Sequence, residues 1–152
     1  MADLSLLSEQ LSALLTNEHS AIANLANASA LINDSVEQLN WAGFYLFNPQ
    51  SKQLDLGPFQ GKVACMHIDL GKGVCGVAAS TKEVQIVDDV SKFDSYIACD
   101  SAAKSELVVP LLRKDGSLYG VLDLDAPILN RFDKEFAKKM TEFANRLMTT
   151  ID

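Results

Sequence analysis

Apolar residues recur with two different periods along the chain, and the change of period separates two kinds of structure. Between residues 4 and 33, leucine and isoleucine recur at helical spacing, which predicts two helices interrupted near Thr16. We expect this pair to form an amphipathic layer covering a sheet. From Trp41 the period changes to two, so that Trp41 and Tyr45 share one face of a strand and Phe44 lies on the other.

Strand-like segments continue for about eighty residues, and a last helix follows them. The strands are predicted at Trp41–Phe47, Gln53–Phe59, Val63–Asp69, Glu83–Val87, Glu106–Leu112 and Leu118–Asp125. Asp115-Gly116 is typical of a hairpin turn, and apolar residues at helical spacing predict a helix over about residues 132–149. The order predicts a single α+β domain over residues 1–152, with N-terminal helices at about 4–33, a sheet core at about 41–125 and helices packed on that central sheet.

Composition and charge narrow the classes of partner. The 152 residues carry a formal net charge of -7, which argues against a nucleic-acid or anionic-membrane surface. The longest apolar run, Trp41–Phe47, is far too short for a membrane span. No Lys or Arg precedes Lys52, so the start of the chain lacks the pattern of a secretory leader, and we expect a cytoplasmic protein.

Three cysteines are the first candidates for chemistry. Cys99 lies in a segment of 18 residues without clear periodicity, residues 88–105, and loops of that length inside a domain are often functional. Cys65 is predicted on a strand and Cys75 follows a glycine-rich loop. All three could instead be inert core residues, or Cys65 and His67 on one strand face could bind zinc. No C-x-x-C pair supports zinc, and we expect no metal and no cofactor.

Paired aspartates are the second candidate. Asp123 and Asp125 alternate with leucines, so both carboxylates fall on one face of a strand, about 7 Å apart. That face could simply be solvated. The two aspartates could also line an acidic pocket for a cationic group such as a free amine, or form a pair of carboxyl groups that shares a proton. Glu106, at the start of the adjoining strand, could join them.

Three further patterns are weaker indications of a functional site. Trp41 and Tyr45 on one strand face could be core or binding site. The glycine-rich loop at 71–76 lacks the spacing of known phosphate-binding loops. A hydrolase with a Cys-His-Asp triad would have to use His67, and nothing in the sequence favours it.

Six segments in order resemble the free methionine-(R)-sulfoxide reductases, which are stand-alone GAF-domain enzymes. The segments are Asn40–Leu46, Leu56–Lys62, Gly71–Gly76, Ile97–Ser101, Ser105–Pro110 and Gly120–Asp125. The resemblance runs from about Asn40 to Phe132 and includes all three cysteines. It implies an antiparallel sheet of about six strands with helices on both faces, in a homodimer. Many relatives have His where this chain has Tyr96, so the rate or pH optimum is expected to differ.

The resemblance also implies roles for the candidate residues. Cys99 resembles the catalytic thiol, Cys65 the resolving partner and Cys75 an auxiliary cysteine. Trp41 and Tyr45 resemble an aromatic wall around the methyl-sulfur end of the substrate. Glu106, Asp123 and Asp125 resemble the acidic residues that hold the amino group and the sulfoxide of the substrate.

The chemistry implied is reduction of free L-methionine-(R)-sulfoxide. Cys99 would attack the sulfoxide sulfur, methionine would leave, and the resulting sulfenic acid would condense with Cys65 to a disulfide. Thioredoxin would reduce that disulfide by thiol–disulfide exchange. The alternatives are a non-catalytic GAF module that binds a small ligand, and a redox sensor that uses Cys65 and Cys99 without turnover.

Overall fold

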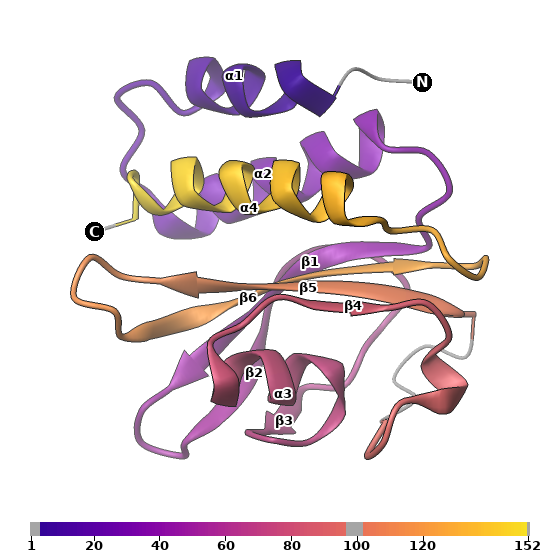
Figure 1. Cartoon of the computed structure of the whole chain (residues 1–152). Coiled ribbons are helices and arrows are strands. Elements are labelled where there is room, and N and C mark those ends of the chain that lie inside the picture. Colours follow the sequence, from indigo (N-terminus) through magenta and orange to yellow (C-terminus); the bar gives the residue numbers. More distant parts are fainter. Residues whose placement is uncertain (1–3, 97–101, 152) are drawn as a thin grey trace.

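Six strands form one antiparallel sheet with helices on both faces, as Figure 1 shows. The computed structural model describes residues 4–96 and 102–151. The strands are β1 (Trp41–Asn48), β2 (Gln53–Gly61), β3 (His67–Asp69), β4 (Gln85–Val87), β5 (Ser105–Leu112) and β6 (Leu118–Ala126). They lie in the order β3-β2-β1-β6-β5-β4, and every neighbouring pair is antiparallel. The predicted α+β class is confirmed.

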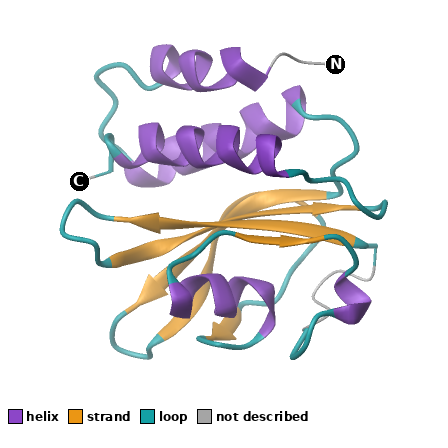
Figure 2. Cartoon of the chain, in the orientation of Figure 1, coloured by secondary structure: helices purple, strands orange, loops and turns teal. Residues whose placement is uncertain are grey.

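Four α-helices in the described part of the chain complete the layers (Figure 2). They are α1 (Leu4–Leu14), α2 (Ala21–Ser35), α3 (Gly73–Thr81) and α4 (Lys134–Met148), and a 3-10 turn spans Val90–Lys92. Helices α2 and α4 cover one face of the sheet and α3 covers the other. The expectation that both N-terminal helices cover the sheet is wrong for α1, which packs chiefly on α4 and forms an outer layer. No helix in the described ranges is long and apolar enough to cross a membrane.

Polar caps set where the helices begin. Ser20 accepts a hydrogen bond from the N–H of Ala23 at the start of α2, and Asp133 accepts one from the N–H of Phe136 at the start of α4. These caps satisfy backbone donors that have no partner within the helix. The break predicted near Thr16 is therefore followed by a capped helix.

The alternation of β1 separates two cores. Ala42 and Phe44 point toward α2 and α4 and are fully buried there. Trp41 and Tyr45 point to the opposite side and pack with Val74 of α3 in a second, smaller core. Because the sheet is covered on both faces, both faces of β1 are buried from Trp41 to Tyr45. The residues that could bind a ligand lie on the α3 side.

One predicted strand is shorter than the pattern indicated. The segment predicted as a strand over Val63–Asp69 pairs with β2 only from His67 to Asp69. The preceding residues 62–66 form a loop, and Val63 and Met66 are exposed there, at 89% and 71%. The apolar side chains before His67 therefore give a strand-like pattern in the sequence, although these residues are not part of the paired strand.

Replacing Gly43 by alanine is expected to destabilise the fold strongly. A Cβ at Gly43 would overlap the Cβ of Phe59 and lie 2.7 Å from its Cα, so β2 would have to move. Phe59 stacks on Trp41 with ring centroids 5.0 Å apart, so its displacement also disturbs the α3-side core. We expect a loss of about 3 kcal/mol in the free energy of unfolding, measured by urea denaturation. Ser80→Ala, at an exposed position of α3, is the control and should change it little; equal stability of Gly43→Ala and wild type would contradict this account.

Candidate active site

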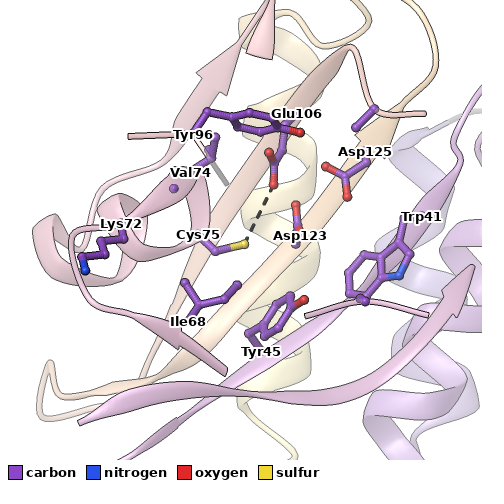
Figure 3. Close-up of a pocket in the computed structure, with 13 residues that line it drawn as sticks. Trp41, Tyr45, Ile68, Lys72, Val74, Cys75, Tyr96, Glu106, Asp123 and Asp125 are labelled. Carbon is purple, nitrogen blue, oxygen red and sulfur yellow. Dashed lines mark hydrogen bonds between the residues drawn. The ribbon is translucent and has the colours of Figure 1, made fainter. Parts of the chain in front are cut away.

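A pocket lies between α3 and the sheet, at the end of the sheet where β5 begins and β6 ends. Its cavity volume is about 30 Å³. Figure 3 shows the side chains that surround it. Six of the predicted site residues line it: Trp41, Tyr45, Cys75, Glu106, Asp123 and Asp125. The structure therefore brings together residues from β1, α3, β5 and β6 that lie up to 84 positions apart in the sequence (125 − 41 = 84).

Strand register places the three carboxyl groups side by side. Glu106 of β5 lies directly opposite Asp125 of β6, and Asp123 is two residues further along the same face. All three are buried, with 6%, 5% and 7% of Glu106, Asp123 and Asp125 exposed. The alternative of a solvated strand face is wrong, because α3 covers these residues.

Burial makes these carboxyl groups reluctant to ionise. It raises the pKa of Glu106 well above its ordinary value of 4.5, and the nearby charges of Asp123 and Asp125 raise it further. Burial also raises the pKa of Asp123. Like charges in a buried pocket cannot all ionise easily together, so burial and its neighbours favour the protonated form of Glu106.

Cys75 brings a sulfur atom into the same pocket. It lies in the first turn of α3, is 4% exposed, and its Sγ is 3.9 Å from Oε2 of Glu106. Burial raises the pKa of this thiol well above its usual range, and the charge of Asp123 acts in the same direction. A thiol in that state is a poor nucleophile. The structure thus records Cys75 as a free, buried thiol.

Two aromatic residues join the pocket to the loop that carries Cys65. The rings of Trp41 and Tyr45 stack with centroids 5.8 Å apart. The indole N–H of Trp41 donates to the carbonyl oxygen of Lys62 at 3.1 Å, and the hydroxyl of Tyr45 donates to that of Cys65 at 3.0 Å. These bonds hold the loop at residues 62–66 against the edge of the pocket. Trp41 and Tyr45 therefore line the pocket and also anchor the loop at residues 62–66.

Cys65 lies in that loop and not on a strand, which corrects the prediction made from sequence. It is half-buried and disulfide-bonded. The Nδ1 atom of His67 lies 2.8 Å from a carboxylate oxygen of Asp55 on the exposed side of β2 and β3. Within the described residues, the group of possible metal ligands that lie close together includes neither Cys65 nor His67, so the structure gives the zinc alternative no support. Cys99 lies outside the described residues.

Sequence reasoning missed several residues that line the pocket. Ile68, Val74 and Ala103 add apolar surface, and Tyr96 closes one side, as Figure 3 shows for the labelled residues. The amine of Lys72 points away from the pocket and lies 3.5 Å from the carboxylate of Asp69. Of these residues, Tyr96 is already singled out by the sequence, at the position where the family resemblance leads one to expect His.

The fold and the pocket together are typical of one protein family. The GAF domain model matches residues 23–152, and this chain belongs to the GAF domain family. The free methionine-R-sulfoxide reductase of Saccharomyces cerevisiae is 50% identical over 82% of this chain and 74% of its own length. The enzyme of the same name from Escherichia coli is 42% identical over 96% of this chain and 88% of its own.

A solved structure agrees with these two relatives. The free methionine-R-sulfoxide reductase of Neisseria meningitidis, in complex with its substrate, superposes with a TM-score of 0.93 and 38% identity. The match covers 97% of this chain and 87% of that chain. Within the GAF domain family, this chain belongs to the free methionine-R-sulfoxide reductases, which are oxidoreductases.

Proposed function

We propose that this enzyme reduces free L-methionine-(R)-sulfoxide through cysteine sulfenic acid chemistry. The Cys99 thiolate attacks the sulfoxide sulfur and forms a sulfur–sulfur bond. The protonated sulfoxide oxygen is then transferred to the Cys99 sulfur as that bond breaks, which gives methionine and Cys99 sulfenic acid. The thiol of Cys65 then attacks that sulfenic sulfur, which releases water and forms a Cys65–Cys99 disulfide. Substrate has gained two electrons and the two cysteines have lost them.

The observation that carries this proposal is the set of three buried carboxyl groups in an aromatic-walled pocket. Free methionine sulfoxide has an ammonium group, and Asp123 and Asp125 give the pocket the negative charge that binds one, beside the protonated Glu106. Trp41 and Tyr45 supply apolar wall for the methyl-sulfur end. Methionine sulfoxide within a polypeptide has a neutral amide in place of the ammonium group, so the pocket rejects it.

Glu106 is the acid that the reaction needs. A sulfoxide oxygen becomes a good leaving group only when it is protonated, and Glu106 keeps its proton near neutral pH because it is buried beside other carboxyl groups. Asp123 and Asp125 then serve the ammonium group. We assign the roles in this way because burial and the charges of neighbouring groups raise the pKa of Glu106 more than that of Asp123.

The disulfide pairing rests on where the other two cysteines are. Cys75 is a free buried thiol, whereas Cys65 is disulfide-bonded in a loop flanked by exposed Val63 and Met66. Such a loop offers a protein reductant access to a sulfur atom. We propose thioredoxin as that reductant, acting by thiol–disulfide exchange in the cytoplasm, where reduced dithiol proteins are maintained.

Cys65→Ser should separate the chemical step from recycling. With thioredoxin as the reductant, this variant is expected to form one methionine per chain and then stop, because the sulfenic acid has no resolving thiol. With dithiothreitol, which reduces a sulfenic acid directly, turnover should continue. Methionine release is counted by amino-acid analysis, and wild type should form many methionines per chain with either reductant. Unchanged thioredoxin-supported turnover by Cys65→Ser would exclude it as the resolving cysteine, and a wild type that stops after one event would indicate the redox sensor.

We also propose that the enzyme is a homodimer. Exposed Leu6 and Leu14 of α1 and Ile22 of α2 give the helical side apolar surface away from the pocket. Light scattering coupled to size-exclusion chromatography should give twice the chain mass of 16.5 kDa.

A further inference from the structure

One thiol and two carboxyl groups converge in the pocket in a way that the reductase chemistry does not require. Ligand atoms of Cys75, Glu106 and Asp123 all lie within 4.8 Å of one another, and each of the three residues is buried. Figure 3 shows the three side chains pointing toward one another from α3, β5 and β6. The proposed mechanism uses Cys99 and Cys65 and gives Cys75 no step.

An independent observation concerns the hydrogen bonding of Asp123. Its Oδ1 atom is buried and has no hydrogen-bond partner among the residues that the structure describes. A buried oxygen without a hydrogen-bond partner destabilises the folded protein. Asp123 is 95% buried and lines the pocket, so a ligand atom that enters the pocket can satisfy this oxygen. A cation does so without needing a donor hydrogen.

The spacing suits a small divalent cation that accepts sulfur. A zinc ion bound to sulfur at ~2.3 Å and oxygen at ~2.0 Å separates those two atoms by about 3.5 Å at a tetrahedral angle. The Sγ of Cys75 and Oε2 of Glu106 are 3.9 Å apart, so little movement is needed. A thiolate ligand favours zinc over magnesium or calcium, which prefer oxygen ligands alone. Three protein ligands leave the fourth position open toward the pocket.

We propose that Cys75, Glu106 and Asp123 form an inhibitory site for a thiophilic divalent cation, and that this cation and the substrate exclude each other. The exclusion rests on the proposed function, in which Glu106 and Asp123 also contact the sulfoxide substrate. On binding, the Cys75 sulfur–hydrogen bond is replaced by a sulfur–metal bond and the Glu106 oxygen–hydrogen bond by an oxygen–metal bond, and both protons pass to solvent. No electron is transferred, so the site inhibits reversibly and is not a redox centre.

Zinc titration of the protein without substrate tests the site itself. Trp41 is the single tryptophan of the chain and lines the pocket, so its fluorescence reports binding, and calorimetry gives the stoichiometry. We expect one zinc ion per chain and no response to magnesium. The same result is expected in Cys65→Ser/Cys99→Ser, where Cys75 is the remaining cysteine.

Single substitutions separate this site from other surfaces. Cys75→Ala and Asp123→Asn should each weaken zinc binding by at least about 10-fold, since even residues that only support a ligand change metal affinity that much. His67→Ala removes the exposed imidazole beside Asp55 and should leave zinc affinity unchanged. Absence of zinc binding, binding that survives both Cys75→Ala and Asp123→Asn, or binding lost in His67→Ala would each overturn the site.

Competition tests the shared use of the pocket. Free methionine sulfoxide should weaken zinc binding in proportion to its concentration, and zinc should raise the KM for the sulfoxide without changing kcat. Zinc binding that the sulfoxide leaves unchanged would refute mutual exclusion. Reductase activity measured without zinc reports separately on the proposed function, so failure of one proposal is distinguishable from failure of the other.

Discussion

The Cys99→Ser variant is expected to form no methionine from free methionine-(R)-sulfoxide. A serine hydroxyl does not ionise near neutral pH and cannot form a sulfenic acid, so both the attack on sulfur and the acceptance of oxygen are lost. This is the largest effect that any single side chain should have. Amino-acid analysis after long incubation with dithiothreitol measures it, because dithiothreitol removes any dependence on recycling.

Two controls make that result specific. The thermal unfolding transition of Cys99→Ser should match that of reduced wild type, which shows that the fold is intact. Substrate should still bind, with the change in Trp41 fluorescence as the readout, because the pocket residues are unchanged. Robust multiple turnover by Cys99→Ser would mean that the nucleophile is another group, and the buried Cys75 thiol would then be the first to test.

Glu106→Gln is expected to lower kcat about 10²–10⁴-fold, the range typical of a lost general acid. Glutamine has nearly the same shape and keeps a hydrogen-bond donor, but it cannot transfer a proton to the sulfoxide oxygen. The effect should fall on kcat more than on KM if proton transfer is the main role. Glu83→Gln, at an exposed position, is the matched control and should leave both parameters unchanged. A Glu106→Gln enzyme within a few-fold of wild-type kcat would contradict the assignment.

The same variant changes the pH dependence of stability in a defined direction. Burial raises the pKa of Glu106 in the folded state above its ordinary value of 4.5. Stability from the protonated form is therefore complete below pH 4.5 and is lost as pH rises toward the folded pKa, by up to about 1.4 kcal/mol per pH unit for one proton. Glu106→Gln should lose less unfolding free energy than wild type between pH 5 and 8 in urea denaturation. Parallel curves for the two proteins would show that Glu106 does not hold a proton in the folded state.

Much of the fold could be predicted because apolar residues recur at helical spacing in the helices and turn residues separate the apolar strands. The alternation of Trp41 with Phe44 gave both faces of β1 correctly, and Asp115-Gly116 gave the hairpin between β5 and β6. The strand assigned to residues 63–66 was wrong because pairing with β2 begins only at His67, and Val63 and Met66 are exposed. Periodicity reports that side chains alternate, and it carries no information on which strand lies alongside.

The site was predictable only in part for a related reason. Alternation places Asp123 and Asp125 on one face, but whether that face is solvated depends on α3, which is distant in sequence. The contact of Cys75 with Glu106 likewise depends on how α3 packs on β5, and no local pattern encodes it. The resemblance to a known family grouped these residues because it carries information about the whole fold. Spacing alone left the acidic pocket and the solvated face as equal possibilities.

The most direct test of the central claim is chiral amino-acid analysis after incubation with racemic free methionine sulfoxide and dithiothreitol. The account predicts selective loss of the R epimer and equal gain of methionine, while a peptide with blocked termini that contains methionine sulfoxide is left untouched. Folded, reduced protein that consumes neither epimer would contradict it.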